Sequence, residues 1–392
     1  MNNIEFRVLA ALASIFSLRM LGLCLLLPVF ALEASKYPAA TAQLIGIAVG
    51  IYGLMQALLQ IPFGVLSDKY GRRPLILVGL CLLVLGSLIC YKATSIFGLI
   101  VGRCLQGSGA IGSVVIAALI DHTREQVRVR AMAILGMSIG LAFVFALAGG
   151  PWFNQVLGFK GVFMLTALLA LGGIILLRTI PKNTVTTAAK DLSLSRHNWR
   201  EFCFNPQLGR LYFGIFALHA SLAALFLVLP LLIQKYGVDA DQLWILYAFA
   251  LVLALLIALS ALIYYERRQQ LDLLQLLAIS GLLLAELGLC FAKYPSAIIM
   301  ILVIFFSAFC ILEASLPTQV SKYAPSNKRG AALGLYSSLQ FLGIFFGGMI
   351  GGYLHGRFGS TAVLGLCMGL AASWLGLIFF RGKLEWQEAS IK

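Results

Sequence analysis

The chain has 392 residues, of which 61% are hydrophobic and only 11% are charged. Soluble domains carry about 25% charged residues, so this composition excludes a water-exposed globular surface and predicts a polytopic membrane protein. The formal charge of +14 would suit a nucleic-acid partner, but the basic residues fall in short gaps between apolar runs. We therefore expect no nucleic acid and interpret the charge as a topology signal.

Twelve apolar runs are long enough to cross a bilayer, which takes about 20 residues per helix. They occupy residues 8–31, 44–63, 74–91, 96–119, 131–150, 162–180, 209–232, 242–264, 272–291, 296–320, 330–353 and 360–380. The longest polar gap separates the sixth run from the seventh. We therefore predict an all-α membrane fold with a six-helix half at 1–180, a cytoplasmic linker at 181–208, and a second six-helix half with a short tail at 209–392.

The basic residues also predict the orientation of the chain. An even number of helices places both termini on one side, and most of the 29 Lys and Arg residues fall on that side. The opposite side holds only Lys36, Lys92, Lys160, Lys235, Lys293 and Arg357. Because basic loops stay in the cytoplasm, we expect both termini there.

The cysteines predict neither a disulfide framework nor a metal site. None of the eight belongs to a CxxC pair, and seven lie inside apolar runs, where a thiol packs as a small hydrophobic group. No GxxxxGK[ST] segment occurs, which excludes a P-loop. We expect no metal, no cofactor and no ATP.

The gap between the second and third runs, GVLSDKYGRRP at 64–74, is predicted to be a charged turn. Gly64 and Gly71 permit a tight turn, and Pro74 suits the first turn of a helix. The Asp68 carboxylate is suited to a helix N-terminus, whose dipole favours an anion. This segment resembles G-x-L-[SA]-D-[RK]-x-G-R-[RK]-P, the signature between helices 2 and 3 of the major facilitator superfamily of secondary transporters.

The resemblance implies a twelve-helix transporter, not an enzyme, in which this segment takes part in gating. In that family the Asp matching Asp68 meets the start of helix 11 when the cytoplasmic side is closed. The Arg matching Arg72 pairs with an acid that ends helix 4, here Asp121. The predicted gating residues are Gly64, Asp68, Gly71, Arg72, Arg73 and Asp121. A solvated loop that only enforces topology is the alternative, because isolated surface ion pairs are weak.

Ionisable residues inside a bilayer are costly and mark candidate functional sites. The candidates for the transport cavity and proton coupling are Arg19, Arg103, Gln106, His219, Glu286 and Glu313. In GRCLQGSGA at 102–110, we expect Arg103, Gln106, Gly107 and Ala110 to share one helix face. An arginine cannot release a proton, so Arg103 would keep a carboxylate deprotonated, bind an anionic substrate or bond structurally to backbone carbonyls.

A proton carrier must be one of the Glu or His residues. Glu313 lies four residues before Pro317, so we expect it on a broken helix. His219 near the middle of its helix titrates near neutral pH unaided. Glu286 lies in the outer part of its helix. For His219 and Glu286, a simple interhelical hydrogen bond is an equal alternative.

Further segments resemble proton-coupled members of the superfamily. The Arg103 segment is similar to their R-x-x-Q-G-x-G-A pattern, and residues 16–22, 45–54 and 218–219 resemble the YajR group of proposed drug-efflux proteins of bacterial inner membranes. Two departures weaken an antiporter assignment: the glycine pattern of helix 5 ends at Pro151, and Arg19 lies on helix 1, where many drug antiporters carry an acid. We do not expect the small soluble domain that follows helix 12 in some YajR members.

The resemblance implies a monomer in the bacterial inner membrane that exports amphipathic small molecules in exchange for protons. It would work by alternating access about a midplane site, with the proton gradient as energy source. Two alternatives stay open. One is a proton symporter that imports an anionic nutrient bound by Arg19 and Arg103, and the other is a transporter-like receptor without flux.

Overall fold

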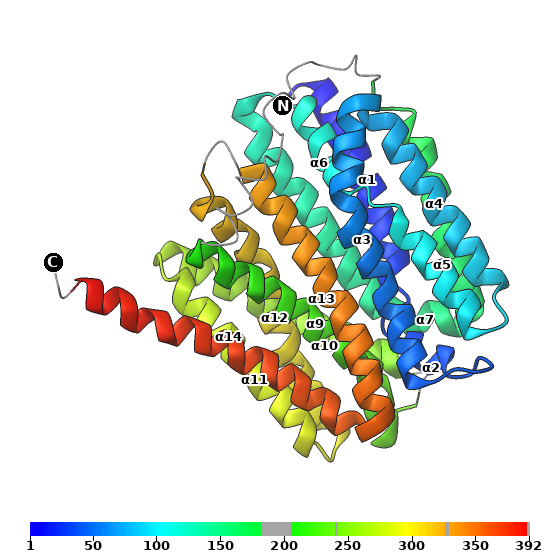
Figure 1. Cartoon of the computed structure of the whole chain (residues 1–392), viewed down its shortest axis with the longest axis vertical. Helices are drawn as coiled ribbons and strands as arrows, with labels where there is room; N and C mark the ends of the chain where they lie inside the picture. Colours follow the sequence, from blue (N-terminus) through cyan, green and yellow to red (C-terminus); the bar gives the residue numbers. More distant parts are fainter. Residues whose placement is uncertain (182–204, 240–241, 326–328, 390–392) are drawn as a thin grey trace. The chain divides into compact units, whose positions relative to one another are not determined.

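The computed structural model describes residues 1–181, 205–239, 242–325 and 329–389 (Figure 1). The chain divides into two compact units, the first formed by Met1–Ser193 with Ala240–Trp244 and the second by Leu194–Asp239 with Ile245–Lys392. Nearly all of the predicted linker at 181–208 lies outside the described residues.

The first unit is a helical bundle in which helices far apart in the sequence pack together. α1 packs against α7, α4 packs against α5 and α7, and α3 packs against α5. Apolar side chains of α1, α4 and α6, including Leu12, Ile76 and Val115, are fully buried in its core. The helices are α1 (Asn3–Cys24), α2 (Phe30–Ala34), α3 (Ala42–Tyr70), α4 (Arg72–Lys92), α5 (Ile96–Ser108), α6 (Gly112–Asp121) and α7 (Glu125–Leu177).

The second unit is built around its first helix. The helices are α9 (Pro206–Lys235), α10 (Leu243–Arg267), α11 (Leu271–Phe291), α12 (Pro295–Tyr323), α13 (Arg329–Phe358) and α14 (Ser360–Ala389). α9 packs against α12, α13 and α14, and 83% of its most apolar stretch is buried. Such a helix is apolar on all sides because it has protein on all sides.

Small residues allow α13 to approach α9 closely. A Cβ atom at Gly347 would overlap the Ala220 carbonyl group, and one at Gly343 would overlap the Phe216 carbonyl oxygen. Interfaces of this kind are typical of membrane helices, which associate through van der Waals packing rather than through a hydrophobic driving force. The glycines of α13 therefore set the distance between these two helices.

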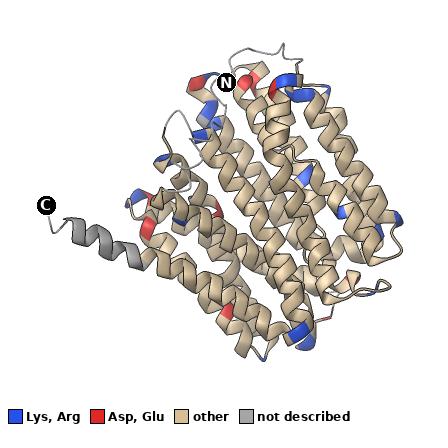
Figure 2. Cartoon of the chain, viewed as in Figure 1, with Lys and Arg blue, Asp and Glu red and all other residues tan. Residues whose placement is uncertain are grey.

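The structure confirms the prediction of an all-α polytopic membrane protein. Among the described residues, eleven helical spans are long and apolar enough to cross a membrane, with α5 and α6 counted together as Ile96–Asp121. They correspond to the twelve predicted runs because α7 contains two of them. Figure 2 shows that charged residues gather mainly at helix ends, whereas the helix bodies are mostly uncharged. The orientation of the termini stays a prediction.

Two runs that we predicted as single helices are broken. Run 8–31 divides into α1 and α2 because Pro28 has no backbone N–H to continue the helix. Run 96–119 divides into α5 and α6 at residues 109–111, where Gly109 has φ −78° and ψ 60°. The expectation that Ala110 shares a helix face with Arg103 was therefore wrong, since Ala110 lies in the break.

Other boundaries also differ from the prediction. The segment at 64–74 is not a turn throughout, because α3 continues to Tyr70 and only Gly71, with φ 92° and ψ 156°, separates it from α4. Gly64 lies inside α3, where a Cβ atom would be 3.5 Å from the Ser113 hydroxyl. The runs at 131–150 and 162–180 lie on two helical segments, as predicted; both carry the label α7 and meet at a kink where Gly158 has φ 71° and ψ 165°. α12 continues through Pro317, so Glu313 does not lie on a broken helix.

Candidate functional site

Arg72, the first residue of α4, is the centre of an ion-pair cluster. Its Nε donates to Asp121 Oδ2 at 2.9 Å, and its Nη1 donates to the Ser67 hydroxyl at 2.6 Å and contacts Asp68. The Arg72 side chain is only 12% exposed. The structure thus brings Asp68, Arg72 and Asp121 together, with Gly71 providing the turn that places Arg72 beside the end of α3.

A second ion pair, which the sequence analysis missed, lies one turn from Asp121. Glu5 accepts hydrogen bonds from the backbone N–H, Nε and Nη2 of Arg124, at 3.1, 2.8 and 3.2 Å. These bonds raise the pKa of the Arg124 guanidinium above its usual range. The only signal in the sequence was Asn2-x-x-Glu5, a polar capping box at the start of α1.

The two ion pairs tie together one end of the first unit. Arg72 connects the α3–α4 junction to the end of α6, and Arg124, just before α7, is held by Glu5 at the start of α1. Figure 1 shows the α3–α4 junction at the same end of the unit as the N-terminus. Among the predicted gating residues, Arg73 makes no ion pair to the described part of the chain.

Arg103 lies in a polar network inside the first unit. Its Nη1 donates to Gln106 Oε1 at 3.0 Å, and Gln106 in turn donates to the Ser87 hydroxyl of α4 at 2.8 Å. The Arg103 Nε donates to the Ala48 carbonyl at 3.4 Å, and the guanidinium lies 4.9 Å from the centre of the Tyr52 ring. These contacts connect α5 to α3 and α4.

Arg19 approaches the same tyrosine from α1. Its Nη2 donates to the Tyr52 hydroxyl at 3.0 Å and to the Gly109 carbonyl at 3.2 Å, beside the break between α5 and α6. The side chain is only 1% exposed, yet its Nε and Nη1 have no hydrogen-bond partner among the described residues. Two buried guanidinium groups therefore flank Tyr52.

In the second unit, three polar side chains from three helices meet. The Gln340 amide of α13 donates to His219 Nε2 of α9 at 2.8 Å and to Glu313 Oε1 of α12 at 3.1 Å. The other Glu313 oxygen lies 3.7 Å from His219 Nε2, and Phe309 packs 5.7 Å from the imidazole. The His219 side chain is 7% exposed and the Glu313 side chain 41%, so the cluster connects a buried ring to a partly exposed side chain whose Oε2 is buried.

The contacts of the imidazole fit one neutral tautomer. His219 Nδ1 lies 3.3 Å from the Ile215 carbonyl, which accepts a hydrogen bond only if Nδ1 carries the proton. In that tautomer, Nε2 accepts from the Gln340 amide.

Glu286 of α11 is separate from this cluster. Its side chain is completely buried, and both carboxyl oxygens lack a hydrogen bond of ordinary geometry among the described residues, although the Ser221 hydroxyl of α9 lies close by. The structure therefore does not bring Glu286 together with His219 and Glu313. It is a buried acid in a different part of the same unit, whereas Glu313 is partly exposed.

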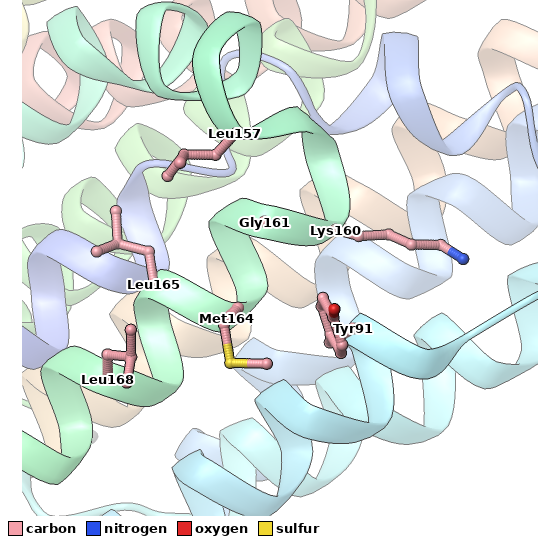
Figure 3. Close-up of a pocket in the computed structure, with 7 residues that line it drawn as sticks. All are labelled: Tyr91, Leu157, Lys160, Gly161, Met164, Leu165 and Leu168. Atoms are coloured by element: carbon pink, nitrogen blue, oxygen red, sulfur yellow. The ribbon is translucent and has the colours of Figure 1, made fainter.

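A surface groove of about 710 Å³ lies on the first unit, away from all of these clusters. It is lined by Tyr91 of α4 and by residues of α7 around the Gly158 kink, namely Leu157, Lys160, Gly161, Met164, Leu165 and Leu168. Figure 3 shows the Lys160 side chain extending away from the three leucines. None of the predicted site residues lines this open, largely apolar groove.

Known proteins resemble the chain over most of its length. The profile described as Major Facilitator Superfamily matches residues 9–348. The Escherichia coli (strain K12) "Inner membrane transport protein YajR" is 38% identical over 95% of this chain and 82% of its own. "Multidrug resistance protein MdtH" of Aeromonas hydrophila is 27% identical over 86% of this chain and 84% of its own. The crystal structure of the human organic anion transporter MFSD10 shares the fold, with a TM-score of 0.71 and 18% identity over 96% of this chain and 100% of its own.

Proposed function

We propose that this chain, which belongs to the Major Facilitator Superfamily and is therefore a transporter, exports amphipathic small molecules in exchange for protons. Export would proceed by alternating access, driven by the proton gradient and without a further cofactor. The proposal places the chain in a bacterial inner membrane as a monomer with both termini in the cytoplasm. The relative named as an inner membrane transport protein supports that location.

The His219–Gln340–Glu313 cluster is the observation that carries the proposal. Glu and His are the side chains that can load and release a proton, and both meet here on membrane helices. Gln340 donates to both groups at once, so a change of protonation at either one alters its bonds to the other. Because the three residues come from α9, α12 and α13, this change would be transmitted to the packing of three helices.

Glu286 would be a second candidate for the residue that carries the proton. A buried carboxyl group without a charged partner is stable only when it is neutral, so it has to give up its proton through a change in its surroundings. Its position away from Glu313 makes it a separate candidate for the coupled proton. The two acids can be distinguished by mutating each to Gln.

The Arg72 cluster would act as the gate of the first unit. Ion pairs at a helix junction can break and reform in each transport cycle, because each is worth little when it is exposed to water and more when it is enclosed. The predicted contact between Asp68 and the start of the eleventh run belongs to this proposal. Arg72 would hold Asp68 in place for that contact.

Relatives with named substrates favour drugs as cargo. Besides the multidrug resistance protein, a class B tetracycline resistance protein of Escherichia coli is 32% identical over 32% of this chain. These names are consistent with cargo that is amphipathic rather than strongly polar. Import of an anionic nutrient stays the second candidate, because Arg19 and Arg103 have no carboxylate within 4.0 Å in the described part of the chain.

Accumulation of a fluorescent lipophilic cation tests the proposal in cells that lack their own efflux pumps. Cells that express the wild-type chain should accumulate less dye than cells with an empty vector, and a protonophore should abolish the difference. The Glu313→Gln variant at equal expression should behave like the empty vector. Equal accumulation with and without the wild-type chain, across cationic and neutral dyes, would contradict drug export.

A further inference from the structure

The interior of the first unit holds a positive charge without an acidic partner among the described residues. Arg19 is 1% exposed, and no carboxylate lies within 4.0 Å of it among the described residues. The Tyr52 hydroxyl and the Gly109 carbonyl accept only from Nη2, and Nε and Nη1 are left without partners. Neutral acceptors satisfy hydrogen bonds but do not balance a charge, so a buried guanidinium of this kind is strongly unfavourable on its own.

A second cation lies close to the first. Arg103 is 7% exposed and likewise has neutral partners, the Gln106 side chain and the Ala48 carbonyl. Its guanidinium lies against the ring of the tyrosine whose hydroxyl accepts from Arg19. Two positive charges that share one neighbour repel each other in a region of low dielectric constant. An anion held near both would remove this repulsion.

The break between α5 and α6 adds donors at the same place. α6 begins at Gly112, and no side chain caps its first N–H groups, since Ile111 is the N-cap residue. Uncapped N–H groups and the helix dipole together favour a bound anion. Arg19 reaches the Gly109 carbonyl, three residues before α6 begins, so its guanidinium lies beside this helix terminus. The Arg19 guanidinium and the N-terminus of α6 are both positive, so both attract an anion.

We propose that Arg19, Arg103 and the N-terminus of α6 form a binding site for a small monovalent anion. Nε and Nη1 of Arg19 lack partners, and each can donate a charged hydrogen bond to a halide, a nitrate or a carboxylate oxygen. The anion is either a free inorganic ion or the carboxylate of an organic molecule. The site does not depend on the direction in which cargo moves.

Binding of radiolabelled chloride to the purified full-length protein in detergent tests this site without any flux. Wild-type protein should bind chloride saturably, at one site per chain, with displacement by unlabelled chloride. Arg19→Gln and Arg103→Gln should each weaken binding by roughly tenfold or more, because each removes a charged donor. Arg357→Gln is the matched control, since Arg357 is exposed and donates to the Tyr353 hydroxyl at the end of α13, and it should bind as wild type does.

Competitors identify the source of the anion. Displacement by nitrate but not by acetate assigns the site to inorganic anions, whereas displacement by both extends it to carboxylates of organic molecules. The absence of saturable chloride binding by the wild-type protein would overturn the proposal, as would undiminished binding in Arg19→Gln. If Arg19→Gln does not fold, Arg19→Lys replaces it, because this variant keeps the charge but loses the planar arrangement of donors. Arg19→Lys should still weaken chloride binding. Full binding by both Arg19→Lys and Arg103→Gln would also overturn the proposal.

Discussion

We expect the Arg72 side chain to matter more for the transport cycle than for stability. It contacts Asp68, Asp121 and Ser67, all at the junction of α3, α4 and α6. Because the two carboxylates are about a third exposed, at 29% and 32%, water screens both pairs. Exposed pairs contribute about 1 kcal/mol or less to the free energy of unfolding.

We therefore expect Arg72→Gln to lower the rate of transport by roughly tenfold, as couplings between conformational states usually do, while the unfolding temperature changes by only a few degrees. The measurement is dye export together with thermal unfolding of the purified protein. Lys69→Gln, which removes an exposed positive charge three residues away, is the control and should transport normally. Wild-type transport by Arg72→Gln would remove the gating role of the cluster.

Glu313 is the residue at which proton coupling is tested most sharply. Gln in its place keeps the size of the side chain and a hydrogen-bonding oxygen for Gln340, but it cannot take up or release a proton near neutral pH. We expect Glu313→Gln to abolish pH-dependent transport while the protein remains folded. Glu266→Gln, at an exposed position near the end of α10, should keep that dependence.

If Glu313→Gln transports cargo with the same pH dependence as the wild type, the role of proton carrier would pass to Glu286. The same assay on Glu286→Gln then decides, because the two acids lie in separate surroundings. His219→Asn adds a third test of the cluster. It removes the ring that Gln340 bonds, and we expect the same loss as in Glu313→Gln if the two groups act together.

The helices show which parts of the structure could be predicted from the sequence. All twelve apolar runs are helical, because runs of this length can satisfy their backbone hydrogen bonds in a membrane only as helices. The breaks at 25–29 and 109–111 were missed because hydrophobicity does not change there. The helix through Pro317 shows the reverse error, since a proline inside a membrane helix is tolerated when its neighbours satisfy the freed carbonyl groups.

The candidate site was predictable only in part, for a related reason. The family resemblance implied the pair of Arg72 and Asp121, and helical spacing placed Arg103 and Gln106 on one face. The partners Glu5 and Tyr52 were missed because each comes from a different helix, and no pattern in the sequence connects it to its arginine. Contacts between distant segments depend on how the helices are rotated, which composition does not determine.

The close packing of α9 and α13 gives a prediction at the scale of helices. In Gly347→Ala the new methyl group meets the Ala220 backbone, which cannot move aside without shifting α9. Overpacking of this kind costs about 1–3 kcal/mol, so we expect a clearly lower unfolding temperature. Gly365→Ala on α14 has open space around the new methyl group and should unfold at the wild-type temperature or above it. Equal unfolding temperatures for the two variants would contradict this account of the interface.

For the whole molecule, the distribution of basic residues predicts which ends of the helices face the cytoplasm. In a variant without the native cysteines, Lys36→Cys lies between α2 and α3, and Lys69→Cys lies in the last turn of α3. A membrane-impermeant maleimide added to intact cells should label position 36 and not position 69, because basic loops stay inside. The opposite pattern of labelling would invert the topology.

The central claim, exchange of cargo for protons, is tested most directly in proteoliposomes that contain the purified protein, with a pH-sensitive dye trapped in an acidic lumen. The account predicts that adding a lipophilic cation outside makes the lumen less acidic at a rate that depends on the protein. It also predicts that Glu313→Gln abolishes this proton movement while the Glu266→Gln control retains it. Proton movement in the same direction as an added anion, with no response to cations, would contradict antiport and favour import of an anionic nutrient.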